Sequence, residues 1–245
     1  MKQKVPSVFL TAEWRHLAML NYVIDPEILA PLVPAGTELD FWNGKTFVSV
    51  VGFQFQKTRV RGIAIPFHTE FEEINLRFYV RRKATDGWRR GVVFIKEIVP
   101  RSVIAWVART IYNEPYIALP TSHRIKKVAR RPGEVRYAAY FWRFNGRRNF
   151  LKLVTDGDAQ PLADGSEAEF ITEHYWGYTA QRNGSTLEYR VEHPRWRVWA
   201  SQAAELNCEV AALYGKTFEE TLRRAPFSAF LAEGSPVKVF RGVRI

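Results

Sequence analysis

Polar residues with the potential for chemistry are concentrated in the segment FEEINLRFYV, which spans residues 71–80. Successive side chains of an extended strand point to opposite faces, so Glu73, Asn75 and Arg77 share one face while the other face is mostly apolar. If the polar face lines a cavity, Arg77 could hold an anionic or carbonyl group and Glu73 could act as an acid or base. The alternative is a solvated face, on which a Glu73–Arg77 ion pair would contribute little stability.

Two further side chains are candidates for chemistry. Lys96 lies in the apolar segment GVVFIKEIVP, where a buried amine could act as a nucleophile. A lysine whose stem packs while its ammonium reaches water is the simpler interpretation. His174 lies among aromatic residues where an expected helix gives way to a strand. It is interpreted as a structural histidine, although general acid–base catalysis is open to it.

The sequence contains no pattern typical of a metal site or a nucleotide site. The five histidines lack a close spacing such as HExxH, and the single cysteine, Cys208, cannot build a thiolate cluster. The motifs GxGxxG, GxxxxGK[ST] and GxSxG do not occur. We therefore expect neither a metal nor a cofactor.

One domain is expected to position these residues, because closed or sandwiched β architectures commonly reach the length of this chain, 245 residues, as one unit. With one cysteine no intrachain disulfide is possible, which favours a reducing, cytoplasmic compartment. The first residues lack the apolar stretch of a signal peptide, and every apolar run is far shorter than the ~20 residues that span a bilayer. A membrane partner is not expected, and the residues do not indicate an oligomeric state.

Four turn signals indicate an antiparallel framework. Asn43-Gly44, Asp86-Gly87, Asn145-Gly146 and Asn183-Gly184 each separate β-branched or aromatic runs, as two-residue hairpins require. The expected strand pairs are 37–42 with 45–56, 71–82 with 88–99, 135–144 with 147–154, and 175–181 with 185–192. Both alternating sets of residues 47–55 begin with apolar side chains, which favours a closed barrel with a covering layer over a one-sided sheet.

Helices are expected to be few and short. Asp25 is predicted to cap a helix that has Pro26 at its first position, and Ser102 to begin a helix over 103–112. Ser166 with Glu169, and Thr217 with Glu220, have the spacing of a capping box.

The chain also resembles the YqjF-like bacterial family over nearly its whole length. The segments that carry the resemblance are WRHLAMLNYVIDPEILAPLVPAGTELDFWNGKTFVSVVGF, FEEINLRFYVRR, GVVFIKEIVPR, ARTIYNEPY, FITEHYWGY and VEHPRWRVW. That family is similar in fold to acetoacetate decarboxylase. The resemblance implies a mostly β (α+β) domain with a closed antiparallel barrel, flanking sheet strands and a few short helices, and an active site inside the barrel.

The resemblance does not extend to the lysines of the decarboxylases. Those enzymes carry the pattern Gly-Arg-x-x-(Trp/Tyr)-Gly-(Phe/Tyr)-Pro-Lys-Lys, whose first lysine forms a Schiff base, and the best match here is ARTIYNEPYI. Arg109, Tyr112 and Pro115 fit this pattern, but Tyr116 and Ile117 occupy the lysine positions. Neither side chain can form an imine, so the characteristic decarboxylation is not expected.

Together the residues and the resemblance predict a small-molecule pocket for an organic acid or a carbonyl compound. Glu73, the best match to a glutamate of the decarboxylases, is the candidate catalytic residue. The candidate ligand-binding residues are Asn75, Arg77, Tyr112, Tyr116 and His174. Whether such a protein is an enzyme, and of which reaction, cannot be read from these residues.

A basic composition supports a different function. Lys and Arg number 36 against 25 Asp and Glu, which gives a formal charge of +11, and the chain has eight tryptophans. Phosphate contacts and aromatic stacking cooperate in single-strand binding, so a nucleic-acid- or polyanion-binding module is the alternative. The basic pairs do not form one helical stripe, and a solvated basic surface also accounts for the charge. A non-catalytic interaction protein is the third possibility.

Overall fold

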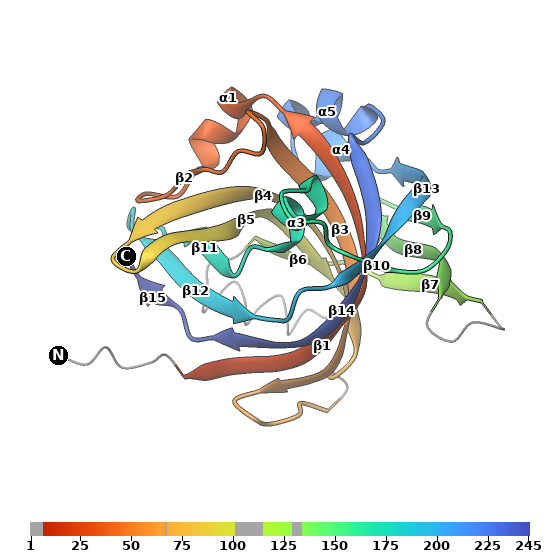
Figure 1. The fold of residues 1–245 in the computed structure, drawn as a ribbon, viewed down its shortest axis with the longest axis horizontal. Helices are drawn as coiled ribbons and strands as arrows, with labels where there is room; N and C mark the ends of the chain where they lie inside the picture. The colour runs from red at the N-terminus through yellow and green to blue at the C-terminus, as the bar shows by residue number, and fades with distance from the viewer. Residues whose placement is uncertain (1–6, 67, 101–114, 129–133) are drawn as a thin grey trace.

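A ring of long antiparallel strands dominates the computed structural model, which describes residues 7–66, 68–100, 115–128 and 134–245. The ring order is β12-β11-β5-β4-β3-β1-β14, and pairing of β12 with β14 closes it (Figure 1). The β5–β11 pair is parallel, and the other neighbours in the ring are antiparallel. These strands are β1 (Val8–Ile24), β3 (Thr46–Val60), β4 (Phe71–Ala84), β5 (Gly87–Val99), β11 (Trp176–Ala180), β12 (Thr186–Glu192) and β14 (Ser228–Phe240).

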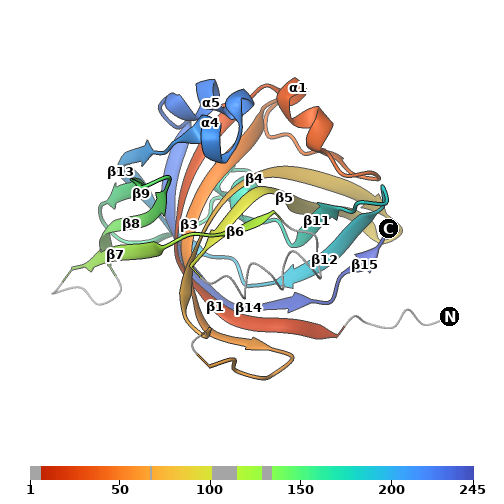
Figure 2. The ribbon, with the colours of Figure 1, turned by 180° about the vertical axis from the view of Figure 1, so that it is seen from behind.

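A second layer of strands packs outside the ring, beside β1, β3 and β4 (Figures 1 and 2). It consists of β7 (Thr121–Lys127), β8 (Val135–Phe144), β9 (Arg147–Thr155) and β13 (Arg197–Asn207). Short strands extend the sheet at its edges: β2 (Glu38–Leu39), β6 (Tyr116–Ala118), β10 (Gln160–Pro161) and β15 (Val243–Arg244). The expected closed, mostly β architecture with a covering layer is confirmed.

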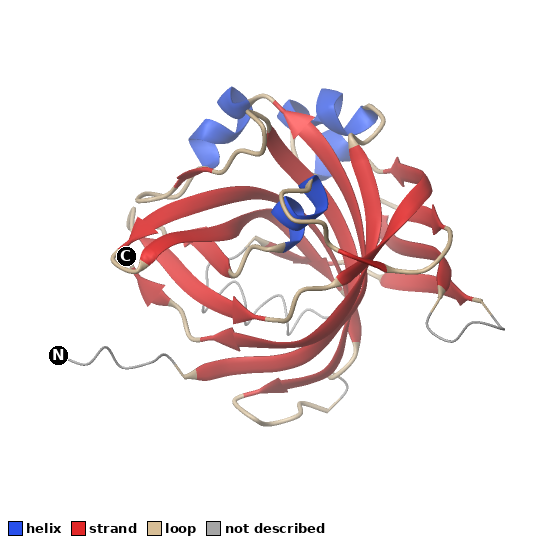
Figure 3. Cartoon of the chain, viewed as in Figure 1, coloured by secondary structure: helices blue, strands red, loops and turns tan. Residues whose placement is uncertain are grey.

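Short helices lie outside and across the ring (Figure 3). They are α1 (Pro26–Leu29), η1 (Ala30–Leu32), α3 (Glu167–Thr172), α4 (Val210–Leu213), η2 (Lys216–Phe218) and α5 (Glu219–Arg223). In Figure 1, α3 lies within the outline of the ring, whereas α1, α4 and α5 gather at one end of the molecule. None of the helices in the described ranges is long and apolar enough to cross a membrane.

Two apolar clusters follow from the two faces of the ring strands. Alternate residues of β3, such as Phe47 and Val51, belong to a cluster inside the ring that also contains Phe170 of α3. Their neighbours Val48 and Val50 belong to a cluster between the ring and the second layer. Strand β3 is therefore buried on both faces, as its two apolar sets predict.

Three of the four expected hairpins are present: β4–β5, β8–β9 and β11–β12. Asn145 and Gly146 both have positive φ, 48° and 77°, as a two-residue turn of this kind requires. The prediction of a hairpin between 37–42 and 45–56 is wrong. The turn forms, and Trp42 bridges Lys45, but β1 and β4 occupy both edges of β3, so β2 pairs with β4 instead.

The helix predictions had mixed outcomes. Asp25 caps α1 by accepting from the Glu27 N–H at 2.9 Å, and Ser166 accepts from the Glu169 N–H at 3.1 Å. The Thr217 cap is wrong: Thr217 lies inside η2, which begins directly after Gly215 (φ 107°), and α5 starts at Glu219 without a side-chain cap. The helix expected over 103–112 lies outside the described residues.

Candidate functional site

Three of the predicted polar residues meet on the inner face of the ring. The Glu73 carboxylate accepts hydrogen bonds from Asn75 Nδ2 at 3.0 Å and from the Tyr116 hydroxyl at 3.1 Å. Glu73 and Asn75 are 3% and 1% exposed. Strand β6 brings Tyr116 to this position because it runs parallel to β5, where Tyr116 is the partner of Glu97. Residues far apart in the sequence therefore form one buried cluster around a carboxylate.

Arg77 lies on the same face of β4 and has a different environment. One terminal nitrogen donates to the Ile171 carbonyl at 3.4 Å, and the guanidinium lies 5.6 Å from the centre of the Tyr79 ring. Its Nε is buried, and no hydrogen-bond partner for it occurs among the described residues. No described carboxylate forms an ion pair with Arg77, so the alternative of a Glu73–Arg77 pair on a solvated face is wrong.

Glu97 is a member of the cluster that the sequence interpretation did not propose. It is 1% exposed and is the direct cross-strand partner of Asn75, so both side chains are on the same face. Lys96 pairs with Leu76 on the opposite face and is only partly buried. In the sequence, strand alternation already indicates that Lys96 and Glu97 point to opposite faces. It does not indicate which of the two faces the interior, and the structure shows that Glu97 does.

His174 has its own buried partners. Its Nε2 lies 3.3 Å from Asp40 Oδ2, and the same oxygen accepts from Arg90 Nε at 2.6 Å. The His174 ring lies 4.7 Å from the Tyr79 ring. Burial lowers the pKa of His174 to about 4, with Asp40 opposing this shift and the Arg90 and Arg77 charges adding to it. The imidazole is therefore neutral at neutral pH and is tied to Asp40 rather than to Glu73.

We expect this buried imidazole to make the fold sensitive to acid. Because the folded pKa, about 4, lies below the model-peptide value of 6.5, the unfolded chain binds more protons between these values. The contribution of His174 to the free energy of unfolding should be fully present above pH 6.5. It should decrease as the pH drops toward 4, by at most ~1.4 kcal/mol per pH unit. In His174→Gln, whose amide can still donate to Asp40, denaturant unfolding between pH 4 and 7 should show a shallower dependence.

The control for that experiment is His68→Gln, in the loop between β3 and β4. This variant should keep the pH dependence of the parent protein. Parallel stability curves for the parent and His174→Gln would mean that His174 does not resist protonation in the folded state.

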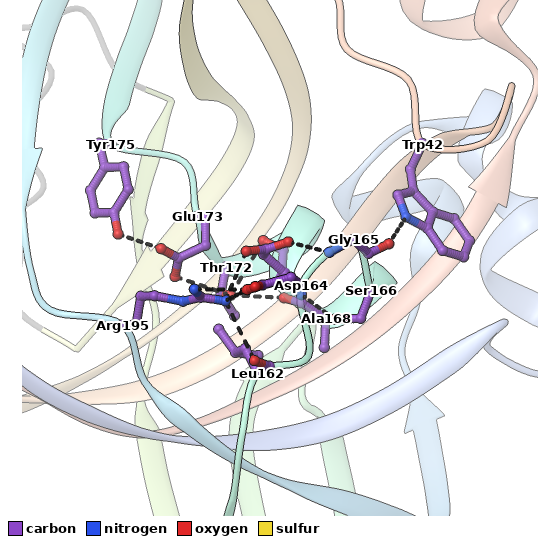
Figure 4. A network of polar contacts seen from close by, with 11 residues as sticks. Trp42, Leu162, Asp164, Gly165, Ser166, Ala168, Thr172, Glu173, Tyr175 and Arg195 are labelled. Atoms are coloured by element: carbon purple, nitrogen blue, oxygen red, sulfur yellow. Dashed lines mark hydrogen bonds and ion pairs between the residues drawn. The ribbon is translucent and has the colours of Figure 1, made fainter.

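A network of polar contacts fastens α3 (Figure 4). The same helix carries the Ile171 carbonyl that accepts a hydrogen bond from Arg77. Arg195 forms ion pairs with Asp164 at 3.0 Å and with Glu169 at 2.8 Å. Glu169 accepts from the Gly165 N–H at 2.6 Å rather than from the Ser166 N–H of a full capping box. Trp42 Nε1 donates to the Gly165 carbonyl at 3.0 Å. Several segments thus hold α3 beside the Arg77 guanidinium.

The remaining predicted residues have simpler outcomes. Tyr112, like Arg109, lies outside the described residues. Within the described part of the chain, no three or more His, Cys, Asp or Glu side chains are placed to hold a metal ion.

Comparisons with known proteins agree on family and fold. The DUF2071 family model, described as an uncharacterized conserved protein, matches residues 11–236. The uncharacterized protein YqjF of Bacillus subtilis is 27% identical over 204 residues, which cover 80% of this chain and 76% of YqjF.

Solved structures of low sequence identity share the fold. The enduracididine biosynthesis enzyme MppR, in a structure described as complexed with pyruvate, has a TM-score of 0.68 at 13% identity, covering 99% of this chain and 91% of its own. The acetoacetate decarboxylase of Legionella pneumophila has a TM-score of 0.66 at 13% identity, covering 98% of this chain and 88% of its own. At this identity the likeness shows the fold alone, which is that of the acetoacetate decarboxylase-like superfamily.

Proposed function

Since this chain belongs to the DUF2071 family and has the acetoacetate decarboxylase-like fold, we propose that it binds a small organic acid or carbonyl compound inside its ring of strands. The proposal is independent of Schiff-base chemistry, because Tyr116 and Ile117 occupy the positions that match the decarboxylase lysines.

The observation that carries the proposal is the state of Arg77. A partly buried guanidinium that has no counter-ion among the described residues is unfavourable, since desolvation of the charge is not offset by a partner. A ligand carboxylate could accept two parallel hydrogen bonds from the planar fork of an arginine, including one from a buried nitrogen that has no described partner. That one relative by fold is described as complexed with pyruvate supports this class of ligand.

The Glu73 cluster gives the proposed pocket a group for proton transfer. Asn75 and Tyr116 hold the Glu73 carboxylate in one orientation, and Glu97 adds a second buried carboxyl group on the same face. With Arg77 binding the ligand's anionic end, Glu73 would face the adjacent carbon or carbonyl oxygen as acid or base. The Tyr116 hydroxyl has one proton to donate, so on ligand binding it would redirect its hydrogen bond from Glu73 to the ligand.

A ligand screen tests the proposal. We expect small carboxylates such as pyruvate, acetoacetate and succinate to raise the melting temperature, because a ligand that binds only the folded state stabilises it by mass action. The corresponding neutral amides should give no shift. If amides and carboxylates act equally, or if no compound in the panel stabilises the protein, the proposal is wrong.

A chemical trap tests whether ligand binding is independent of Schiff-base chemistry. Incubation with acetoacetate and borohydride should leave no covalent adduct at Tyr116 or Ile117, and mass spectrometry of the intact protein should show the unmodified mass. An adduct that maps to Lys96 would mean that an imine forms by another route.

A further inference from the structure

The second layer has an exposed face on which basic and aromatic side chains alternate. We call it the outer basic face. Its members are Arg124 and Lys126 of β7, Tyr137, Phe141 and Arg143 of β8, and Arg148, Phe150 and Lys152 of β9. These strands lie on the outside of the ring in both views (Figures 1 and 2). The interior site around Glu73 and Arg77 has no residue on this face.

Strand register places these side chains on one face. Lys126 is the cross-strand partner of Tyr137, Phe141 of Phe150, and Arg143 of Arg148. Directly opposed residues of an antiparallel pair are on the same face. The intervening residues, Ala138, Tyr140, Trp142, Leu151 and Leu153, are all buried in the cluster between the second layer and the ring. The outer basic face is therefore the side that is turned away from the core.

Cations and rings are in direct contact on this face. The Arg148 guanidinium lies 4.0 Å from the centre of the Phe141 ring, and the Lys126 and Lys152 amines lie 5.6 and 5.1 Å from the Tyr137 and Phe150 rings. The centres of the Phe141 and Phe150 rings are 6.3 Å apart. Phe141 and Phe150 thus form one aromatic surface bordered by positive charge, and Tyr137 lies four residues from Phe141 along the same face of β8.

Few of these charges are neutralised. Lys152 pairs with Glu205 at 2.6 Å, whereas Arg124, Lys126, Arg143 and Arg148 form no ion pair with any described residue. Elsewhere many basic residues form ion pairs with carboxylates: Arg82 and Arg89, for example, both pair with the buried Glu188. The outer basic face therefore carries four cations that are available to an external anion.

We propose that the outer basic face binds single-stranded nucleic acid, with phosphates on its cations and bases stacked on its rings. Grooves and sheets that bind single strands without sequence preference combine these two features, because every base has a face that can stack. A duplex hides its base faces, so the rings would contribute little to binding it. An acidic peptide would satisfy the cations but would leave the three rings unused.

Fluorescence anisotropy with a labelled twelve-nucleotide oligo-dT tests this proposal. We expect binding at ~50 mM salt that weakens steeply toward ~200 mM, because phosphate contacts release counterions. Arg143→Gln/Arg148→Gln should weaken binding about tenfold or more and reduce the dependence on salt, since each lost phosphate contact lowers the salt slope by about one. Phe150→Leu should weaken binding about fivefold or more while leaving the salt slope unchanged, because it removes a stacking surface and no charge.

A matched control removes the same charge from elsewhere on the surface. Arg182→Gln/Lys238→Gln alters two exposed cations of the β11–β12 turn and of β14, and should leave binding unchanged within about twofold. The proposal is overturned if both double variants weaken binding equally, if a duplex of the same length binds as tightly, or if polyglutamate competes as well as oligo-dT. It also fails if no binding is detected at ~50 mM salt.

Discussion

Replacing Arg77 with methionine is expected to abolish binding of any carboxylate that the ligand screen identifies, with a rise in Kd of about 100-fold or more. Truncating one partner of a buried, hydrogen-bonded charge pair costs about 2–5 kcal/mol, and ~2.7 kcal/mol corresponds to 100-fold. Isothermal titration calorimetry measures this directly. Arg77→Lys should give an intermediate affinity, because a lysine keeps the charge but loses the planar fork.

The same substitution is expected to leave the fold intact. In the absence of ligand Arg77 has one hydrogen bond to the Ile171 carbonyl, at 3.4 Å, and no described counter-ion, so its removal leaves no unpaired carboxylate among the described residues. Glu73 keeps its hydrogen bonds to Asn75 and Tyr116. The melting temperature of the free protein should therefore be unchanged or higher.

Arg81→Met is the matched control, since it removes one arginine from the same strand. The Arg81 side chain is 40% exposed and pairs with Glu38 at 2.7 Å on the surface. This variant should bind the carboxylate as the parent protein does. If Arg77→Met retains full affinity, or if Arg81→Met loses as much, Arg77 does not hold the ligand.

Strand periodicity was sufficient to predict most of the framework, because a period of two fixes which side chains share a face. The polar face of β4 is an example: alternation placed Glu73, Asn75 and Arg77 together, and the structure puts Glu73 and Asn75 in contact. The turn at Asn145-Gly146 was equally predictable, since its backbone conformation depends on two local residues.

Contacts between distant strands could not be predicted in this way. Asp40 approaches His174 only because β2 pairs with β4 and not with β3, and that choice depends on which strand edges are free. The outer basic face was missed for the same reason. Its cations come from three strands, and only their register shows that they gather beside Phe141 and Phe150.

Gly234→Ala is expected to lower the free energy of unfolding by about 2–5 kcal/mol, through backbone strain and overpacking together. Gly234 has φ 80° within β14, opposite Arg15 of β1. A Cβ atom there would lie 2.0 Å from the Trp14 carbonyl oxygen and 2.9 Å from Leu17 Cδ1. The left-handed conformation costs an alanine roughly 1–2 kcal/mol, and forced overpacking typically adds about 1–3 kcal/mol. Unfolding in urea, followed by tryptophan fluorescence, gives the difference in free energy.

Gly146→Ala separates the two contributions at Gly234. Gly146 has nearly the same φ, 77°, but a Cβ atom built there meets no atom within 4 Å. It should therefore lose only the conformational part, roughly 1–2 kcal/mol. The difference between the two variants measures the steric contact of β14 with the backbone of Trp14, at the place where β1 and β14 join the ring. Equal losses would mean that β1 moves aside at no cost, and that the close approach of these strands does not constrain the ring.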